Sequence, residues 1–296
     1  MIRFNVSPAQ RFVLFICATA LCFIIGSVIV GIVLYGGMSP ARMRIATVLQ
    51  DLVMFILPAL VTAMIITRRP ATFLSIDRKP DVASVVLVIA ALVASVPAMN
   101  VVISWNENLT LPESMSGLES WMRSSEQSAG DMVKALISGT SVGSLVLAIL
   151  IMGILAGFSE ELFFRGTFQR LLITTPFNAH VAIWITAVVF SAIHMQFFGF
   201  VPRLLLGAFF GYLAWWSGSV WIAVIAHIVN NTCAAVSMWI SARGGVDFNE
   251  IGVSSSSFDR EAVILSIIVT SFLIRIIYKR SRLLGYRNDV RKEKPF

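Results

Sequence analysis

Long runs without a charged residue recur along this chain, and they limit its possible folds more than any other feature. The runs Phe12–Leu34, Val82–Asn106 and Ala135–Ser159 contain 23, 25 and 25 residues. About 20 apolar residues are enough for a helix to cross a bilayer. Only 13% of the residues are charged and 57% are hydrophobic, whereas globular domains are about one-quarter charged. These features predict an all-α, polytopic integral membrane protein.

Eight spans are predicted, and a polar segment separates the third from the fourth. This segment, Glu107–Lys134, carries Trp121 and Met122 and is expected to be an interfacial amphipathic piece. In the second span, Asp51 is interpreted as an interfacial cap or a minor polar contact. The third span is expected to kink at Pro97. The predicted spans are Phe12–Leu34, Ile45–Thr67, Val82–Asn106, Lys134–Leu172, Phe177–Phe198, Arg203–Trp216, Val220–Ile240 and Ala262–Tyr278.

The net charge of +7 follows membrane topology and does not indicate a nucleic-acid partner. Lys and Arg residues cluster beside the apolar runs, as the positive-inside rule describes. With eight spans, 16 of them fall on the side of the two termini and seven on the other side. Both termini are therefore predicted to be cytoplasmic. The compact size and short loops favour a bacterial inner membrane.

One stretch, Gly157–Gly166, places charged residues directly after an apolar run. Glu160 and Glu161 therefore continue a membrane helix, where a charged side chain costs roughly 2.5–3.5 kcal/mol at the centre. Glu161 and Arg165 are four residues apart and can pair on one helix face. Glu160 is rotated by roughly 100° and has no partner nearby in sequence. The pattern fits either a functional site or a juxtamembrane anchor.

Two further predicted spans carry polar residues at the same spacing of four. Phe190 and His194 lie on the fifth span, and His227 and Asn231 lie on the seventh. Polar residues in membrane helices turn toward the protein interior and seek one another. We therefore expect an aqueous pocket inside the bundle. Its predicted lining consists of Glu160, Glu161, His194, His227 and Asn231.

Such a set of side chains can hydrolyse an amide. A glutamate and a histidine can hold and deprotonate a water, while a second histidine and an asparagine amide can donate hydrogen bonds to an oxyanion. Alternatively, Glu160, His194 and His227 could bind zinc with a water in the open position. Each histidine taken alone could also be a hydrogen-bonded core residue. His180, near a helix start, is interpreted as interfacial.

These three motifs, in this order, resemble those of the CAAX-protease and bacteriocin-processing family, which is related to the type II CAAX prenyl protease. The resemblance covers Val142–Trp239 and implies an eight-helix intramembrane endopeptidase. It implies that Glu160 and His194 activate water and that His227 and Asn231 form the oxyanion site. The implied supporting residues are Glu161, Arg165 and Phe190, with no metal as the favoured form.

The predicted function is therefore an intramembrane endopeptidase acting on a membrane-associated protein or peptide. A non-catalytic scaffold or bacteriocin-immunity protein that binds a peptide in the same pocket is the alternative, and a proton-coupled transporter is a weaker one. We expect the lipid bilayer and a peptide substrate as partners. Residues 1–134 would form an N-terminal three-helix region with a polar loop, 135–242 the catalytic core, and 243–296 a polar loop, the last span and a basic tail.

Overall fold

The computed structural model of the protein describes residues 7–137, 139–175, 177–244 and 260–284. Within these ranges the chain is helical and has no strand, so the predicted all-α class is confirmed. The helices are α1 (Pro8–Leu34), α2 (Pro40–Gln50), α3 (Leu57–Ile66), α4 (Pro70–Phe73), α5 (Val82–Glu107), α6 (Ser116–Ile137), α7 (Val142–Ala148), α8 (Ala156–Phe163), α9 (Gln169–Ile173), α10 (Ala179–Ala192), α11 (Phe200–Ser217), α12 (Val220–Gly244) and α14 (Arg260–Leu283).

Short turns of other helix types connect several of these helices. The π-helical turns η1 (Asp51–Ile56), η3 (Ile149–Leu155) and η4 (Phe164–Phe168) run on directly from their neighbours, and η2 (Glu113–Met115) and η5 (Phe197–Gly199) are 3-10 turns. A single π-type turn within an α-helix often marks a functional site. Here η3 and η4 flank α8, the helix that carries the glutamate pair.

Among the described residues, seven helical segments are long and apolar enough to cross a membrane. The predicted integral membrane protein is thus confirmed, while the fifth predicted span is shorter than expected. That helix, α10, has only 14 residues, or about 21 Å at 1.5 Å per residue, against a hydrocarbon core of about 30 Å. It ends at Ala192 because the chain turns at Met195, whose φ is +53°.

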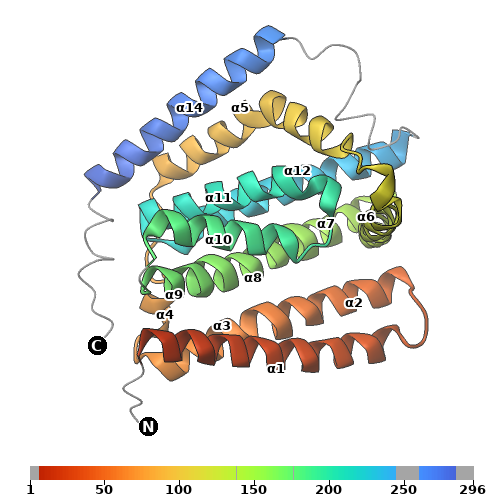
Figure 1. Ribbon diagram of the computed structural model, residues 1–296. Helices are drawn as coiled ribbons and strands as arrows, with labels where there is room; N and C mark the ends of the chain where they lie inside the picture. The colour runs from red at the N-terminus through yellow and green to blue at the C-terminus, as the bar shows by residue number, and fades with distance from the viewer. Residues whose placement is uncertain (1–6, 138, 176, 245–259, 285–296) are drawn as a thin grey trace.

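The helices form three groups, as Figure 1 shows. The first group contains α1, α2 and α3, the middle group contains α7 to α12, and α5 and α14 lie on the opposite side. Phe15 of α1 and Phe55 of η1 pack against Phe163 of α8, with ring centroids 5.0 and 5.4 Å apart. A second apolar cluster joins α5, α11, α12 and α14. The start of α1 and the end of α14 lie at the same end of the bundle.

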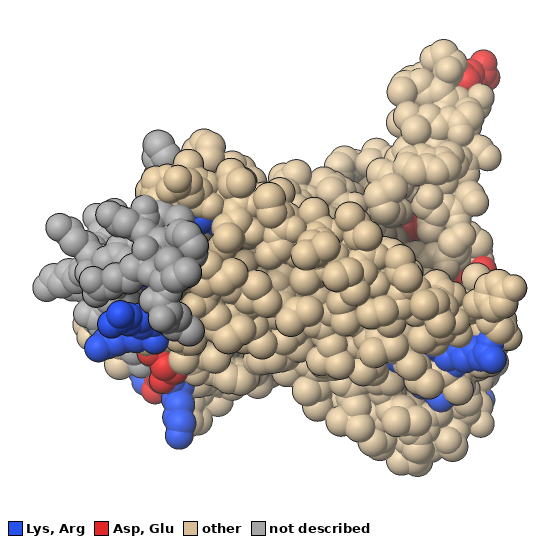
Figure 2. Space-filling view, turned by 90° about the horizontal axis from the view of Figure 1, so that it is seen from below, with Lys and Arg blue, Asp and Glu red and all other residues tan. Residues whose placement is uncertain are grey.

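Charged residues follow the membrane pattern. In the view from below, blue and red atoms gather toward the two ends of the molecule, and the face between them is almost entirely tan (Figure 2). Helix α6, the expected interfacial piece, is drawn nearly end-on in Figure 1 and so lies crosswise to the spans at one end of the bundle. Most of its side chains are exposed. This arrangement fits a helix lying in the plane of the membrane surface.

The proline predicted to kink the third span lies inside the continuous helix α5. Ser266 of α14 inserts its hydroxyl beside Pro97: its Oγ accepts from the amide of Ala98 at 3.2 Å and donates to the carbonyl of Ala94 at 2.5 Å. The hydroxyl thus bridges two backbone groups that would otherwise bond to each other along the helix. Interruptions next to proline are commonly satisfied in this way in membrane helices.

Glycines set the distance between the helices that carry the site. A Cβ on Gly157 of α8 would lie 3.2 Å from the backbone nitrogen of Ile228 on α12. A Cβ on Gly207 of α11 would lie 3.1 Å from the ring of Phe190 on α10. Small residues allow membrane helices to approach closely, so these glycines let α8 pack closely against α12, and α11 against α10. The division into three sequence regions stays a prediction, and 245–259 and most of the basic tail lie outside the described residues.

Candidate active site

A buried ion pair and a histidine form the centre of the candidate site. The side chains of Glu161 and Arg165 are both 0% exposed, and Arg165 Nη1 donates to Glu161 Oε1 at 2.6 Å. The predicted pairing is therefore present, with Glu161 on α8 and Arg165 on η4, which follows directly. His227 Nδ1 lies 2.9 Å from the same carboxylate oxygen. Because a carboxylate only accepts hydrogen bonds, this contact assigns a hydrogen to Nδ1 and directs Nε2 away from Glu161.

Backbone carbonyls of α11 complete the anchoring of this pair. Arg165 Nη2 donates to the carbonyl of Gly207 at 2.7 Å, and one turn further along each helix Gln169 Nε2 donates to the carbonyl of Gly211 at 3.0 Å. Gly207 and Gly211 are four residues apart, a spacing that allows close packing of membrane helices. The structure adds a second role, because glycines leave their own carbonyls open to long polar side chains. The guanidinium group is thereby held on two sides.

Glu160 points away from this ion pair, as its rotation on the helix predicted. Its carboxylate Oε2 lies 3.9 Å from His227 Nε2, and its side chain is 14% exposed. Oε2 is buried and has no hydrogen-bond partner in the described part of the chain. A buried carboxylate oxygen that lacks a donor is costly. Glu161 Oε2 and Asp51 Oδ2 also lack a donor among the described residues, but Glu160 Oε2 is the one that lies near His227 Nε2.

His194 lies just beyond the end of α10 and not within it. Its Nδ1 is 2.7 Å from the carbonyl of Phe190, so this nitrogen carries the hydrogen and Nε2 retains its lone pair. The next residue, Met195, has the left-handed backbone conformation (φ +53°). Such conformations cost of order 1–3 kcal/mol outside glycine and cluster at functional sites. The turn fixes the position of the His194 imidazole, which lies close enough to Glu160 to interact with its charge.

Phe190 holds the two histidines apart and in place. Its ring is 5.1 Å from the His194 ring and 5.8 Å from the His227 ring, in edge-to-face arrangements. The guanidinium carbon of Arg165 lies 4.8 Å from the centre of the same ring. Phe210 of α11, which the sequence did not single out, stacks on His227 at 5.1 Å. Both aromatic rings are almost fully buried, so they fix the imidazole planes by packing.

Asn231 occupies the position expected one turn after His227 but is held by a different helix. Its Nδ2 donates to the carbonyl of Met152 in η3 at 3.0 Å, and its Oδ1 accepts from Asn230 at 3.2 Å. An amide nitrogen carries two hydrogens. One of them remains to donate to another group. The expected aqueous pocket around the predicted residues stays a prediction.

Asp51 is a third carboxylate at this site. Of the two sequence interpretations, an interfacial cap or a minor polar contact, its burial fits the polar contact and not the cap. It is 3% exposed in η1 and lies close to Ser159 and Glu160 of α8. Its Oδ2 is buried without a hydrogen-bond partner in the described part of the chain. Its role was not recognisable because no sequence spacing connects it with α8. The presence of an acidic residue inside an apolar span was the available signal.

The turn after His194 is covered by the amphipathic helix α6. Trp121 packs against Phe197 at 5.2 Å, and Glu126 Oε2 accepts from the backbone amide of Phe198 at 3.1 Å. Arg203 at the start of α11 donates to the side chain of Gln196 at 2.5 Å. The charge of Glu160 also acts on Arg203. This end of the candidate site is therefore closed by polar and aromatic contacts with α6.

The arrangement of these side chains bears on the predicted zinc alternative. Across the described ranges, no group of three or more His, Cys, Asp and Glu side chains is placed to hold a metal ion. His227 Nδ1 and His194 Nδ1 are both used in hydrogen bonds, which leaves only their Nε2 atoms. Zinc at Glu160, His194 and His227 stays a prediction, and we derive no catalytic step through it.

Comparison with known proteins gives a family match over the region that holds this site. Residues 142–233 match the family described as "Type II CAAX prenyl endopeptidase Rce1-like". The predicted resemblance is thus confirmed for this segment, which includes every predicted site residue from Glu160 to Asn231. The "Uncharacterized protein YpbD" of Bacillus subtilis (strain 168) is 23% identical over 113 residues, which is 37% of this chain and 53% of that protein.

The chain spans about half the length of the curated relative that it matches. No solved structure matches the chain. The fold described above therefore stands on the helices and contacts of this protein itself.

Proposed function

We propose that this protein is an intramembrane endopeptidase that hydrolyses a peptide bond with a water activated by Glu160 and His194. The observation that carries the proposal is a pair of acceptor atoms at the site, one on Glu160 and one on His194. Glu160 Oε2 is buried without a donor, and His194 keeps its Nε2 lone pair because Nδ1 is bound to Phe190. A water between them would satisfy both groups and would be polarised for attack. The match of residues 142–233 to a prenyl endopeptidase family supports the same reaction class.

The proposed reaction conserves every proton. Glu160 takes a proton from the water while the oxygen forms a bond to the carbonyl carbon of the peptide. The resulting oxyanion accepts hydrogen bonds from His227 Nε2–H, when the ring carries both hydrogens, and from the second Nδ2 hydrogen of Asn231. Collapse of the tetrahedral intermediate breaks the C–N bond. Glu160 then returns the proton to the leaving amine.

Glu161 and Arg165 would support this reaction without touching the substrate. Glu161 accepts from His227 Nδ1 at 2.9 Å and so fixes which nitrogen faces Glu160. Arg165 holds Glu161 and is itself anchored on the carbonyl of Gly207. An orienting carboxylate behind a catalytic histidine is a recurring arrangement in hydrolases. These two residues are therefore proposed as positioning residues.

We further propose a membrane-associated peptide as the substrate and a bacterial inner membrane with cytoplasmic termini as the location. The 16-to-7 distribution of Lys and Arg supports this orientation. The start of α1 and the end of α14 lie at one end of the bundle, as it requires. The matching family is described as a prenyl endopeptidase, so we propose both prenylated and free peptides as candidate substrates.

A cleavage assay in detergent tests the proposal. A library of quenched-fluorescence peptides, free and prenylated, is incubated with wild-type protein, with Glu160→Ala, and with Glu113→Ala as an exposed control. We expect cleavage by the wild type and by the control variant but not by Glu160→Ala. Peptides that bind with unchanged affinity but are never cut would instead favour the scaffold alternative. Equal cleavage by wild type and Glu160→Ala would refute the mechanism.

A further inference from the structure

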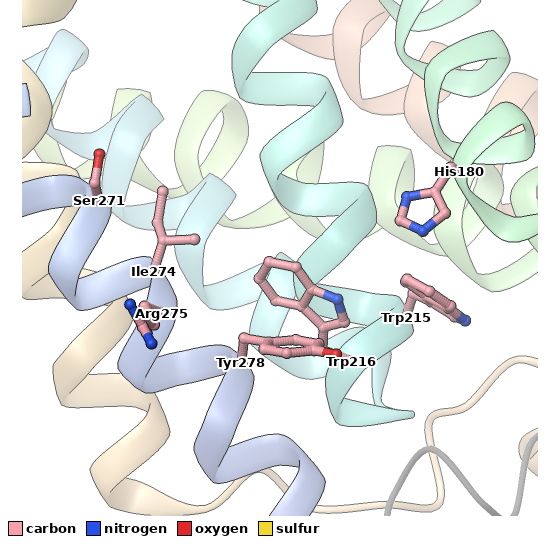
Figure 3. A pocket seen from close by; sticks show the side chains of 7 residues that line it. All are labelled: His180, Trp215, Trp216, Ser271, Ile274, Arg275 and Tyr278. Carbon is pink, nitrogen blue, oxygen red and sulfur yellow. The ribbon is translucent and has the colours of Figure 1, made fainter.

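A cavity outside the candidate active site lies beside the last helix. It has a volume of about 390 Å³ and opens between α14 and the adjoining ends of α10 and α11. Figure 3 shows the side chains around it. None of them belongs to the predicted catalytic set. The lining residues are His180, Trp215, Trp216, Ser271, Ile274, Arg275 and Tyr278.

The cavity is placed at the depth of a membrane–water interface. Arg275 is eight residues before Leu283, where α14 ends, which is about 12 Å along the helix. Trp215 and Trp216 are in the last turn of α11, which ends at Ser217 at the same end of the bundle. Tryptophan and tyrosine at this depth are typical of the headgroup region of a bilayer. The opening of the cavity therefore faces the lipids of the bilayer.

Arg275 supplies a positive charge that no carboxylate of the described residues neutralises. Its neighbour on the same helix, Arg280, shows the contrast, because it binds Asp81 through two hydrogen bonds of 2.6 and 2.9 Å. Arg275 is exposed on an apolar helix, where an uncompensated cation is costly. A guanidinium group matches the geometry of a phosphate and can bind it through two parallel hydrogen bonds.

The walls of the cavity suit the apolar part of a lipid. Trp216 packs against Tyr278 with ring centroids 5.3 Å apart, and His180 packs edge-on against Trp215 at 5.2 Å. His180 is held there by a 2.9 Å hydrogen bond to the hydroxyl of Tyr212. These contacts form a mostly apolar surface next to a single cation. Free phosphate would use the cation alone, whereas a phospholipid would use both.

We propose that this cavity binds an anionic phospholipid, with its phosphate on Arg275 and an acyl chain against the aromatic wall. The charge of the surrounding helix favours an anionic headgroup over a zwitterionic one. Arg282, whose guanidinium carbon lies 5.9 Å from the centre of the Tyr278 ring, adds to the positive potential outside the cavity. Basic pockets between membrane helices commonly bind acidic lipid headgroups. The inference does not depend on the proposed protease activity.

Lipid retention measured by native mass spectrometry tests this site. Delipidated protein is mixed with equal amounts of phosphatidylglycerol and phosphatidylcholine, and the bound lipids are counted. We expect about tenfold preferential retention of phosphatidylglycerol by the wild type. Arg275→Gln should lose this preference, a change of about 1.4 kcal/mol. Lys279→Gln removes the same charge one turn away and should behave as the wild type.

A second variant separates the cavity from the charge. Ser271→Leu fills part of the opening while Arg275 remains, and it should also lose the bound lipid. Retention unchanged in either Arg275→Gln or Ser271→Leu would overturn the proposal. It would also be overturned if phosphatidylcholine were retained equally well, or if excess inorganic phosphate displaced the bound phosphatidylglycerol. Thermal unfolding of each variant checks that the bundle is intact.

Discussion

Replacement of Arg165 by methionine should destabilise the protein more than removal of both partners of its ion pair. In Arg165→Met, the fully buried carboxylate of Glu161 keeps only its hydrogen bond from His227. Breaking a buried pair by removing one partner costs about 3–5 kcal/mol. The remaining His227 contact favours the lower value, about 3 kcal/mol. At about 2–4 °C per kcal/mol, the midpoint of thermal unfolding should fall by about 6–12 °C.

The double variant Glu161→Gln/Arg165→Met provides the decisive comparison. It removes the buried negative charge, while the new amide oxygen can still accept from His227. The carbonyl of Gly207 loses its donor in both variants, so this loss cancels when their melting temperatures are compared. We therefore expect the double variant to recover at least half of the fall in melting temperature that Arg165→Met causes. A neutral pair in place of a buried ion pair is often as stable as the original.

Thermal unfolding in one detergent, followed by circular dichroism, measures both variants. An exposed pair supplies the control, because Arg123 and Glu119 lie 2.7 Å apart but Arg123 is 48% exposed. Arg123→Met should change stability by less than about 1 kcal/mol. A double variant that melts at or below the temperature of Arg165→Met would refute the reasoning, because the unpaired carboxylate would then not be the source of the loss.

Three further predictions concern packing and charge elsewhere. The Arg280 guanidinium holds the pKa of Asp81 well below its usual range, so the stability that this ion pair contributes is present at neutral pH and is lost only as acid titrates the folded carboxylate. Asp81→Asn should cost about 0.2–1 kcal/mol at pH 7, and Asp81→Ala about 1 kcal/mol more because the helix cap is lost too. The difference in melting temperature between wild type and Asp81→Asn should vanish when both are melted in acid. Gly157→Ala should lower the melting point by the equivalent of about 1–3 kcal/mol, whereas Gly117→Ala, with open space around it, should be neutral or stabilising. Asp51→Leu should leave the melting point unchanged or raise it, since a buried carboxylate is removed. Peptide cleavage should fall at least about tenfold, because the contacts of Asp51 with α8 would no longer position the site. A fall in melting point with normal cleavage would contradict both expectations.

The spans and the ion pair of α8 could be predicted because each depends on local sequence. A charge-free run identifies a span by its length, and a spacing of four places Glu161 beside Arg165. The third member of this cluster was not predictable as a contact, because His227 is 66 residues away in sequence. Only the tendency of buried polar groups to find each other indicated that the two would meet. The assigned direction of the His227 ring required the structure.

The end of the fifth span shows where local signals mislead. The predicted fifth span ends at Phe198, but α10 ends at Ala192. The turn is made by Met195 in a left-handed conformation that favours glycine. Because the residue is a methionine, no local signal in the sequence indicated the turn. Packing of Trp121 against Phe197 and the bond from Phe198 to Glu126 hold the turn from outside. Tertiary contacts with α6 therefore override the local preference.

The most direct test of the account is the rate of peptide cleavage by Glu160→Gln, measured on the best substrate from the library screen. Glutamine keeps the size of the side chain but cannot take a proton from water. We predict that kcat falls by about 10²–10⁴-fold, while KM and the melting temperature stay close to those of the wild type. A variant that folds normally and loses no more than a factor of about three in kcat, far less than that range, would contradict the assignment of Glu160 as the general base.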